Sequence, residues 1–122
     1  MKHLISKPTV IPKAWGREEV ICNNANYCGK RLIFNAGAKF SMHAHRNKHE
    51  TFYVVKGALV LRKINTDDAS EVKYCIAPGD VVEIPPMLPH QLIAVVESEV
   101  IEFSTHHEDS DSYRYEKGDS QA

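Results

Sequence analysis

The chain has 122 residues, of which 43% are hydrophobic and 25% are charged. This length favours one domain, and the composition is ordinary for a globular protein with a modest core. The formal net charge of -1 at pH 7 gives no electrostatic reason to expect a nucleic acid or a membrane surface as a partner.

Short apolar or alternating runs, separated by turns, follow one another as far as residue 104. The expected strands, in chain order, span residues 15–22, 30–34, 39–45, 50–55, 58–64, 72–76, 81–84, 91–96 and 99–104. Gly, Pro, Asn and Asp fill the turns, and turns spaced about 8 to 12 residues apart are typical of an all-β sandwich or barrel. No segment of about 11 residues shows the apolar stripe of a helix.

Both ends of the chain lie outside this series of strands. We expect one domain over residues 1–122, with a barrel core over about 14–105 and a polar C-terminal tail over 106–122 that is disordered or folds back over the barrel. The segment Thr9-Val10-Ile11-Pro12 is suited to pairing with a second copy at a sheet edge, so we also expect a homodimer.

The sequence also bears on the compartment. The residues after Met1 carry no long apolar stretch and no small-residue cleavage site, and no run approaches the roughly 20 apolar residues of a membrane span, so we expect a cytoplasmic protein. Its three cysteines form no Cys-x-x-Cys pair, and their odd number favours reduced packing residues over a disulfide framework.

Histidines gather around one strand and one proline-rich loop. His43 and His45 are two residues apart, so their side chains point to the same face of a strand. The turn after His45 places Glu50 on the neighbouring strand, and His90 follows the loop at residues 85–89. Strand parity turns His49 to the opposite face from Glu50. Three imidazoles and one carboxylate suit Zn, Mn, Fe, Co or Ni better than Ca or Mg, although paired histidines on a strand are also common as surface residues.

The glycines and prolines around these histidines carry a resemblance. Gly37-x5-His43-x-His45-x4-Glu50-x6-Gly57 resembles the first motif of the cupin superfamily, and Gly79-x5-Pro85-x4-His90 resembles the second. The second motif departs from the family at Met87, where glycine is usual, and at Ala94, where asparagine is usual. The resemblance covers roughly Ala14 to Thr105. It implies a jelly-roll barrel with one divalent metal ion on His43, His45, Glu50 and His90.

Within that superfamily, the chain is similar to the C-terminal cupin domain of type II mannose-6-phosphate isomerases. The matching segments are Ala14-Trp15-Gly16, Lys30-Arg31, Phe52-Tyr53-Val54-Val55-Lys56-Gly57, Glu108-Asp109 and Arg114-Tyr115-Glu116. Those enzymes have glutamine where this chain has His43, and they carry a nucleotidyl-transferase half that does not occur here. The metal site is therefore expected to be richer in nitrogen, which leaves the substrate open.

The resemblance implies aldose–ketose isomerisation of a small-molecule substrate, a sugar or a sugar phosphate. Arg114, Lys39 and Arg62 are candidates for binding the substrate, and no residue stands out as the general base. Two other functions are compatible with the same residues: a non-catalytic sugar-binding or regulatory cupin, and an iron-dependent cupin dioxygenase.

Overall fold

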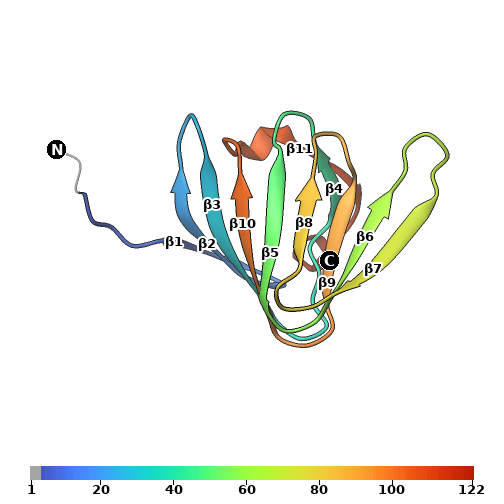
Figure 1. The fold of residues 1–122 in the computed structure, drawn as a ribbon, viewed down its shortest axis with the longest axis horizontal. Helices are drawn as coiled ribbons and strands as arrows, with labels where there is room; N and C mark the ends of the chain where they lie inside the picture. The colour runs from blue at the N-terminus through green and yellow to red at the C-terminus, as the bar shows by residue number, and fades with distance from the viewer. Residues whose placement is uncertain (1–3) are drawn as a thin grey trace.

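The computed structural model describes residues 4–122, which form β-strands and their connections (Figure 1). The strands are β1 (Thr9–Lys13), β2 (Gly16–Asn23), β3 (Cys28–Phe34), β4 (Met42–His45), β5 (Glu50–Lys56), β6 (Leu59–Ile64), β7 (Glu71–Ile76), β8 (Val81–Ile84), β9 (His90–Ala94), β10 (Ser98–Ser104) and β11 (Ser112–Glu116). Two 3-10 turns, η1 (Asp109–Asp111) and η2 (Asp119–Gln121), flank β11. Within residues 4–122, no helix has the length and apolar character needed to cross a bilayer.

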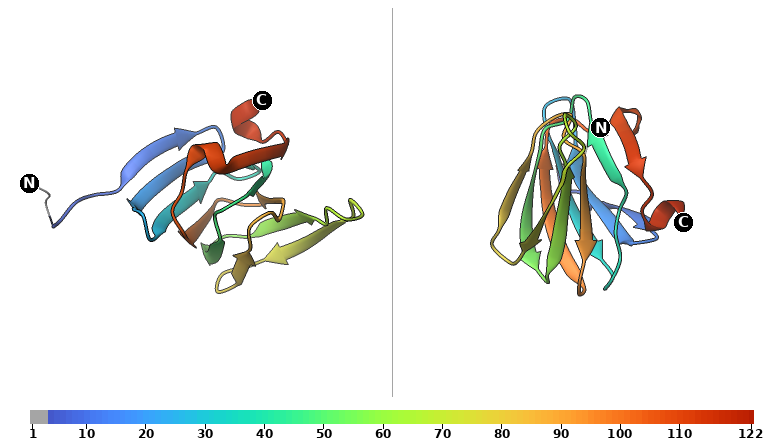
Figure 2. Two further views of the ribbon diagram at one scale, coloured as in Figure 1. Left: turned by 90° about the horizontal axis from the view of Figure 1, so that it is seen from above. Right: turned by 90° about the vertical axis from the view of Figure 1, so that its right-hand side faces the viewer.

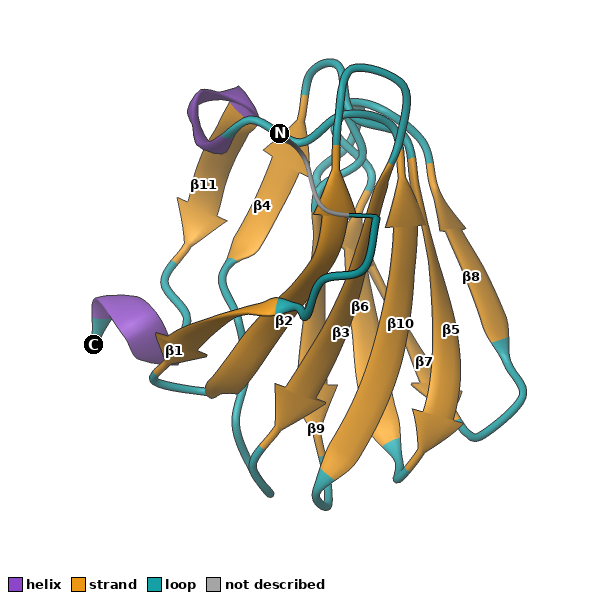
Figure 3. Ribbon diagram, turned by 90° about the vertical axis from the view of Figure 1, so that its left-hand side faces the viewer, coloured by secondary structure: helices purple, strands orange, loops and turns teal. Residues whose placement is uncertain are grey.

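The strands form two sheets in which all neighbours are antiparallel. One sheet has the order β1-β2-β3-β10-β5-β8, and the other has the order β11-β4-β9-β6-β7. Figure 3 shows the six-stranded sheet in front, with β4 and β11 side by side at one end of the molecule. Residues 4–8 extend away from the sheets, whereas the C-terminal residues lie against them (Figure 2). This is the all-β jelly-roll architecture expected from the sequence.

The apolar core lies between the sheets and follows the alternation of the strands. Phe52 and Val54 on β5, Leu92 on β9 and Val100 on β10 are almost completely buried. Each side chain of this size stabilises the fold by roughly 1.5–3 kcal/mol when it leaves water. On β5 the inward series begins with Glu50, and on β9 it begins with His90. The sequence therefore places polar residues at one end of the same inward face that builds the core.

Nine expected strands occur with shifts of a few residues at their ends, and two further strands appear. The strand expected over residues 39–45 is shorter, because Lys39 forms only an isolated bridge with Ile93 before β4 begins at Met42. The segment at Thr9 pairs with β2 of its own chain as β1, which forms one edge of the six-stranded sheet. The three cysteines are free thiols, but only Cys28 is a buried packing residue, since Cys22 is half-buried and Cys75 is exposed.

The C-terminal residues, expected as a polar tail, contain an ordered strand. β11 pairs with β4, with Ser112 opposite His45 and Arg114 opposite His43. All five residues of β11 are exposed, so neither face of this strand contributes to the apolar core. The segment over residues 106–122 is called the C-terminal segment below.

Candidate metal centre

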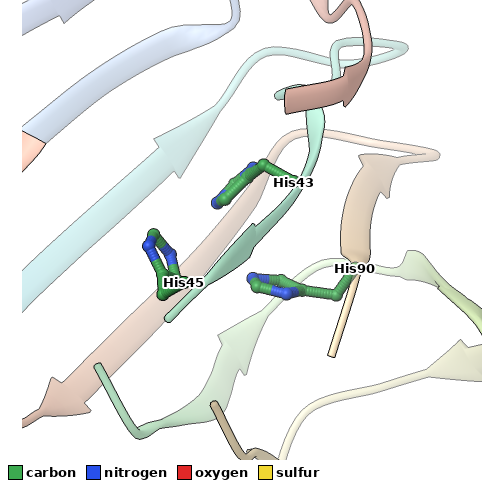
Figure 4. A group of neighbouring side chains, drawn as sticks. All are labelled: His43, His45 and His90. Atoms are coloured by element: carbon green, nitrogen blue, oxygen red, sulfur yellow. The ribbon is translucent and has the colours of Figure 1, made fainter. Parts of the chain in front are cut away.

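Three imidazoles converge between the two sheets. His43 and His45 point from the same face of β4, and His90 comes from β9, where it lies opposite His43 in the strand register (Figure 4). One ring nitrogen from each histidine lies within 4.8 Å of the others. The ring centroid of His43 lies 4.9 Å from that of His45 and 4.8 Å from that of His90. This spacing matches donors that share one small ion.

Each of these rings is oriented by a backbone carbonyl. The Nδ1 atom of His43 lies 2.7 Å from the carbonyl oxygen of Ser41, and that of His90 lies 2.9 Å from the carbonyl of Leu88. The Nδ1 atom of His45 lies 3.3 Å from the carbonyl of Asp111. A carbonyl accepts hydrogen bonds only, so these contacts place the ring proton on Nδ1 and leave the Nε2 lone pair free for a metal.

Glu50 completes the cluster from the opposite sheet. Its Oε1 atom lies 2.7 Å from Nε2 of His90 and 3.7 Å from Nε2 of His45, and the residue is 2% exposed. Within residues 4–122, neither Oε1 of Glu50 nor Nε2 of His90 has a hydrogen-bond partner, although both are buried. Two donor atoms that each lie about 2.1 Å from one ion, with a right angle between their bonds to it, are about 3 Å apart. The distance of 2.7 Å between Oε1 of Glu50 and Nε2 of His90 is close to this value. The residues present therefore fit a divalent cation.

The protonation states agree with this arrangement. Burial lowers the pKa of His43 to about 3, with help from the neighbouring His90 and His45. Burial, followed by the charge of Lys48, lowers the pKa of His45 to about 4. Burial opposes the ionisation of Glu50, but His90 and then Lys48 outweigh it and hold the pKa of this carboxyl below its usual range. At pH 7 His43 and His45 are thus neutral imidazoles and Glu50 is a carboxylate, which are the forms that bind metals.

A buried lysine lies next to the cluster, and sequence reasoning missed it. Lys48 is 3% exposed, and its Nζ atom lies 3.1 Å from Oε2 of Glu50 and 3.1 Å from Oε2 of Glu102. The two carboxylates hold the pKa of Lys48 above its ordinary value despite its burial. Because Lys48 occupies Oε2, Glu50 has Oε1 available for the imidazole cluster. The sequence placed Lys48 in a turn, where a charged side chain normally faces water.

A cavity of about 370 Å³ opens onto the cluster. One part of its wall is aromatic and aliphatic, formed by Trp15, Leu32, Phe40 and Phe52. The rest is polar or charged and includes Glu18, Lys30, Ser41, Lys48, Glu102, His107, Asp109, Ser112 and Arg114. His43, His45 and Glu50 line the cavity, whereas His90 is fully buried behind them. A molecule in the cavity would thus approach the cluster from the side of His43, His45 and Glu50.

The three residues expected to bind substrate occupy different places. Arg114 lines the cavity, and its guanidinium forms no ion pair within residues 4–122. Lys39 lies outside the residues that line it, and its backbone N–H donates to Asp119. Arg62 also lies outside, on the outer face of β6, where Glu71, Gln91 and Glu116 accept its hydrogen bonds. Of the three, only Arg114 lines the cavity that opens onto the cluster.

His49 faces away from the cluster, as strand parity predicts. Its Nε2 atom lies 2.8 Å from Oε2 of Glu83 on the exposed side of β5 and β8. The neighbouring Glu50 points inward.

Comparisons with known proteins agree with this architecture. The structure of the capsular polysaccharide assembling protein CapF from Staphylococcus aureus superposes with a TM-score of 0.79 at 21% identity, over 89% of this chain and 34% of that one. For oxalate decarboxylase from Bacillus subtilis the TM-score is 0.78 at 15% identity, over 88% of this chain and 30% of that one. This chain thus spans about a third of the length of both proteins. For KdgF from Halomonas sp. the TM-score is 0.67 at 22% identity, over 77% of this chain and 81% of that one.

At these identities the superpositions establish a shared fold and nothing finer. A search of the curated proteins finds no match to this sequence. The family model for the cupin domain, by contrast, matches residues 30–106, which include the three imidazoles and Glu50. This match covers more than half of the chain, so the protein belongs to the cupin domain family.

Proposed function

We propose that this cupin holds one divalent transition metal on His43, His45, Glu50 and His90 and isomerises a sugar or sugar phosphate. The observation that carries the proposal is the cavity, which joins the cluster to charged side chains and hydroxyls. Nitrogen-rich ligands favour Zn, Mn, Fe, Co or Ni over Ca or Mg. A wall rich in hydrogen-bonding groups is suited to a polyhydroxylated molecule.

The metal would polarise the carbonyl and hydroxyl oxygens of the substrate and stabilise the charge that develops on them. The protein side chains contribute orientation. His90 lies behind the other ligands, and Phe40 packs against both His43 and His90, with centroid distances of 5.1 and 6.1 Å. The substrate oxygens therefore meet the cluster from the open side of the cavity.

Aldose–ketose isomerisation also needs a base that moves a proton between adjacent carbons. Glu102 is the candidate, because it lines the cavity and its Oε2 atom is held by Lys48 at 3.1 Å. Burial raises the pKa of Glu102, and the nearby charge of Glu50 adds to this effect. A carboxylate whose pKa moves towards neutrality is a more effective proton acceptor and donor at pH 7.

Arg114 would bind the anionic end of a phosphorylated substrate. Its position opposite His43 on the neighbouring strand puts it at the wall of the cavity. Arginine binds phosphate oxygens through two parallel hydrogen bonds. Lys30 also lines the cavity, but its Nζ atom is already paired with Glu18 at 2.8 Å.

One observation favours an iron-dependent dioxygenase as a second candidate. Phe40 and Phe52 place aromatic rings beside His90, with centroid distances of 6.1 and 6.0 Å, so part of the wall is apolar. Oxygen activation benefits from a dry pocket with open metal positions. The charged residues of the remaining wall weigh against this function.

The test is metal analysis of the purified protein followed by assays of sugar and sugar-phosphate interconversion, including mannose 6-phosphate with fructose 6-phosphate. We expect one transition metal per chain, and we expect His45→Ala to lose both metal and turnover. His49→Ala is the matched control, since it removes an exposed imidazole four residues away. Full turnover by metal-stripped protein would refute the metal-dependent isomerase. Iron with oxygen uptake would support the dioxygenase, and sugar binding without turnover would support a regulatory cupin.

We also propose a homodimer in the cytoplasm. The outer face of the six-stranded sheet exposes Tyr53, Val55, Val81 and Phe103, each by more than a third. Tyr53 lies opposite Val81 in the register of β5 and β8, so the apolar side chains are contiguous there. Such patches commonly form subunit contacts. A monomer by light scattering at micromolar concentration would contradict the dimer.

A further inference from the structure

The C-terminal segment reaches the candidate metal centre from the far end of the chain. β11 is hydrogen-bonded along β4, the strand that carries His43 and His45, and η1 comes just before it (Figure 3). All of β11 is exposed, yet Asp111 at the end of η1 is only 6% exposed. A buried carboxylate is costly unless it is fully hydrogen-bonded, so the partners of Asp111 identify what it does.

The carboxylate of Asp111 accepts hydrogen bonds from three consecutive backbone N–H groups. Its Oδ1 atom accepts from Arg46 at 3.0 Å and from Asn47 at 3.1 Å. Its Oδ2 atom accepts from Asn47 at 3.2 Å and from Lys48 at 3.0 Å. Successive N–H groups that converge on one anion form a rigid concave site. These three residues are the central part of the turn that joins His45 to Glu50.

The backbone of the same residue also contacts a candidate ligand. The carbonyl oxygen of Asp111 lies 3.3 Å from Nδ1 of His45. In His43 and His90, by contrast, Nδ1 contacts the carbonyl oxygen of the residue two positions earlier, Ser41 or Leu88. The orientation of His45 therefore depends on a residue 66 positions away in sequence.

We infer that Asp111 is a positioning residue of the metal centre: its carboxylate fixes the turn between His45 and Glu50, and its carbonyl orients the His45 ring. This inference rests on the proposed metal centre. Asp111 does not line the cavity in the described part of the chain, so its role is to hold ligands rather than to touch substrate. Partners of this kind typically contribute 10- to 100-fold to metal affinity, roughly, when they orient a ligand.

The test compares Asp111→Ala with Asp119→Ala by titration with Co²⁺. Asp119 is the matched control, because its Oδ2 atom also accepts a backbone N–H, from Lys39 at 2.9 Å, but away from the turn at residues 46–48. We expect Asp111→Ala to weaken Co²⁺ binding by roughly 10- to 100-fold and to change the visible absorption of the bound Co²⁺. We expect Asp119→Ala to keep the affinity and the spectrum of the unmodified protein.

Failure of this inference is distinguishable from failure of the proposed function. Absence of Co²⁺ binding by the unmodified protein would refute the metal centre itself. Normal binding by Asp111→Ala, with an unchanged spectrum, would overturn only the role of Asp111. If Asp111→Ala does not fold, Asp111→Asn decides, since it keeps one acceptor for Arg46 and Asn47 and loses the acceptor for Lys48. Weaker binding with an altered spectrum supports the inference, and unchanged binding overturns it.

Discussion

The backbone N–H of Met87 donates a hydrogen bond of 2.6 Å to the carbonyl oxygen of His45. This contact ties the loop before His90 to the strand that carries the other two imidazoles. Met87 has a φ of 69°, the left-handed conformation that glycine adopts without strain. The second cupin motif usually has glycine here, so this chain keeps the backbone shape of the motif without its residue.

Replacing Met87 with glycine is therefore expected to stabilise the protein. A left-handed non-glycine residue costs about 1–2 kcal/mol, and the greater freedom of glycine when unfolded returns about 0.5–1 kcal/mol of this. We expect Met87→Gly to raise the free energy of unfolding in urea by about 0.5–1 kcal/mol over Met87→Ala, which keeps the strained Cβ. Equal stability of the two variants would mean that the conformation is not strained.

Arg114→Gln is expected to weaken binding of phosphorylated substrates. A hydrogen bond to a charged group contributes about 1.5–3 kcal/mol, so KM should rise by about 10- to 100-fold with little change in kcat. The matched control is Arg62→Gln, since Arg62 binds Glu71 and Glu116 outside the cavity. Steady-state kinetics with a sugar phosphate would measure both. A similar KM for the two variants would remove Arg114 from the binding site.

Glu102→Gln tests the proposed base. The amide keeps the size of the side chain and an acceptor for Lys48 but cannot take up a proton. We expect kcat to fall by roughly 10²- to 10⁴-fold while the bound metal is retained. Glu99→Gln on the same strand changes a carboxylate paired with Arg31 and is expected to keep kcat. Undiminished turnover by Glu102→Gln would assign the proton transfer to another group.

The metal-free protein is expected to lose stability as the pH falls below about 6.5. The folded-state pKa values of His43 and His45 are lowered to about 3 and about 4, whereas both are near 6.5 when unfolded. Between these values the unfolded chain binds more protons, so acid favours unfolding, by on the order of 3 kcal/mol per histidine near pH 4. Urea unfolding of chelator-treated protein at several pH values would measure this.

The variant His45→Gln removes one of the two titrating rings. Its stability should therefore depend less steeply on pH over the same window. A stability that stays level between pH 7 and pH 4.5 in the metal-free protein would contradict the buried, neutral histidines.

The alternation of apolar residues, together with the glycines and prolines spaced around the histidines, was enough to predict most strands and the convergence of His43, His45 and His90. Glu50 was distinguished from His49 by parity alone. Lys48 was missed because its burial depends on two carboxylates, Glu50 and Glu102, that meet only in the folded chain. β11 was missed because neither of its faces is buried in the core, so its position depends on hydrogen bonds to β4.

The pairing of β11 with β4 has a consequence for synthesis on the ribosome. All four candidate ligands, residues 43–90, leave the exit tunnel before residues 111–116 do. Until those residues arrive, β4 has an unpaired edge and the turn at residues 46–48 lacks its acceptor. A nascent or prematurely terminated chain without residues 111–116 thus lacks the contacts that hold His45 and the turn before Glu50, and we expect it to bind the metal more weakly than the complete fold.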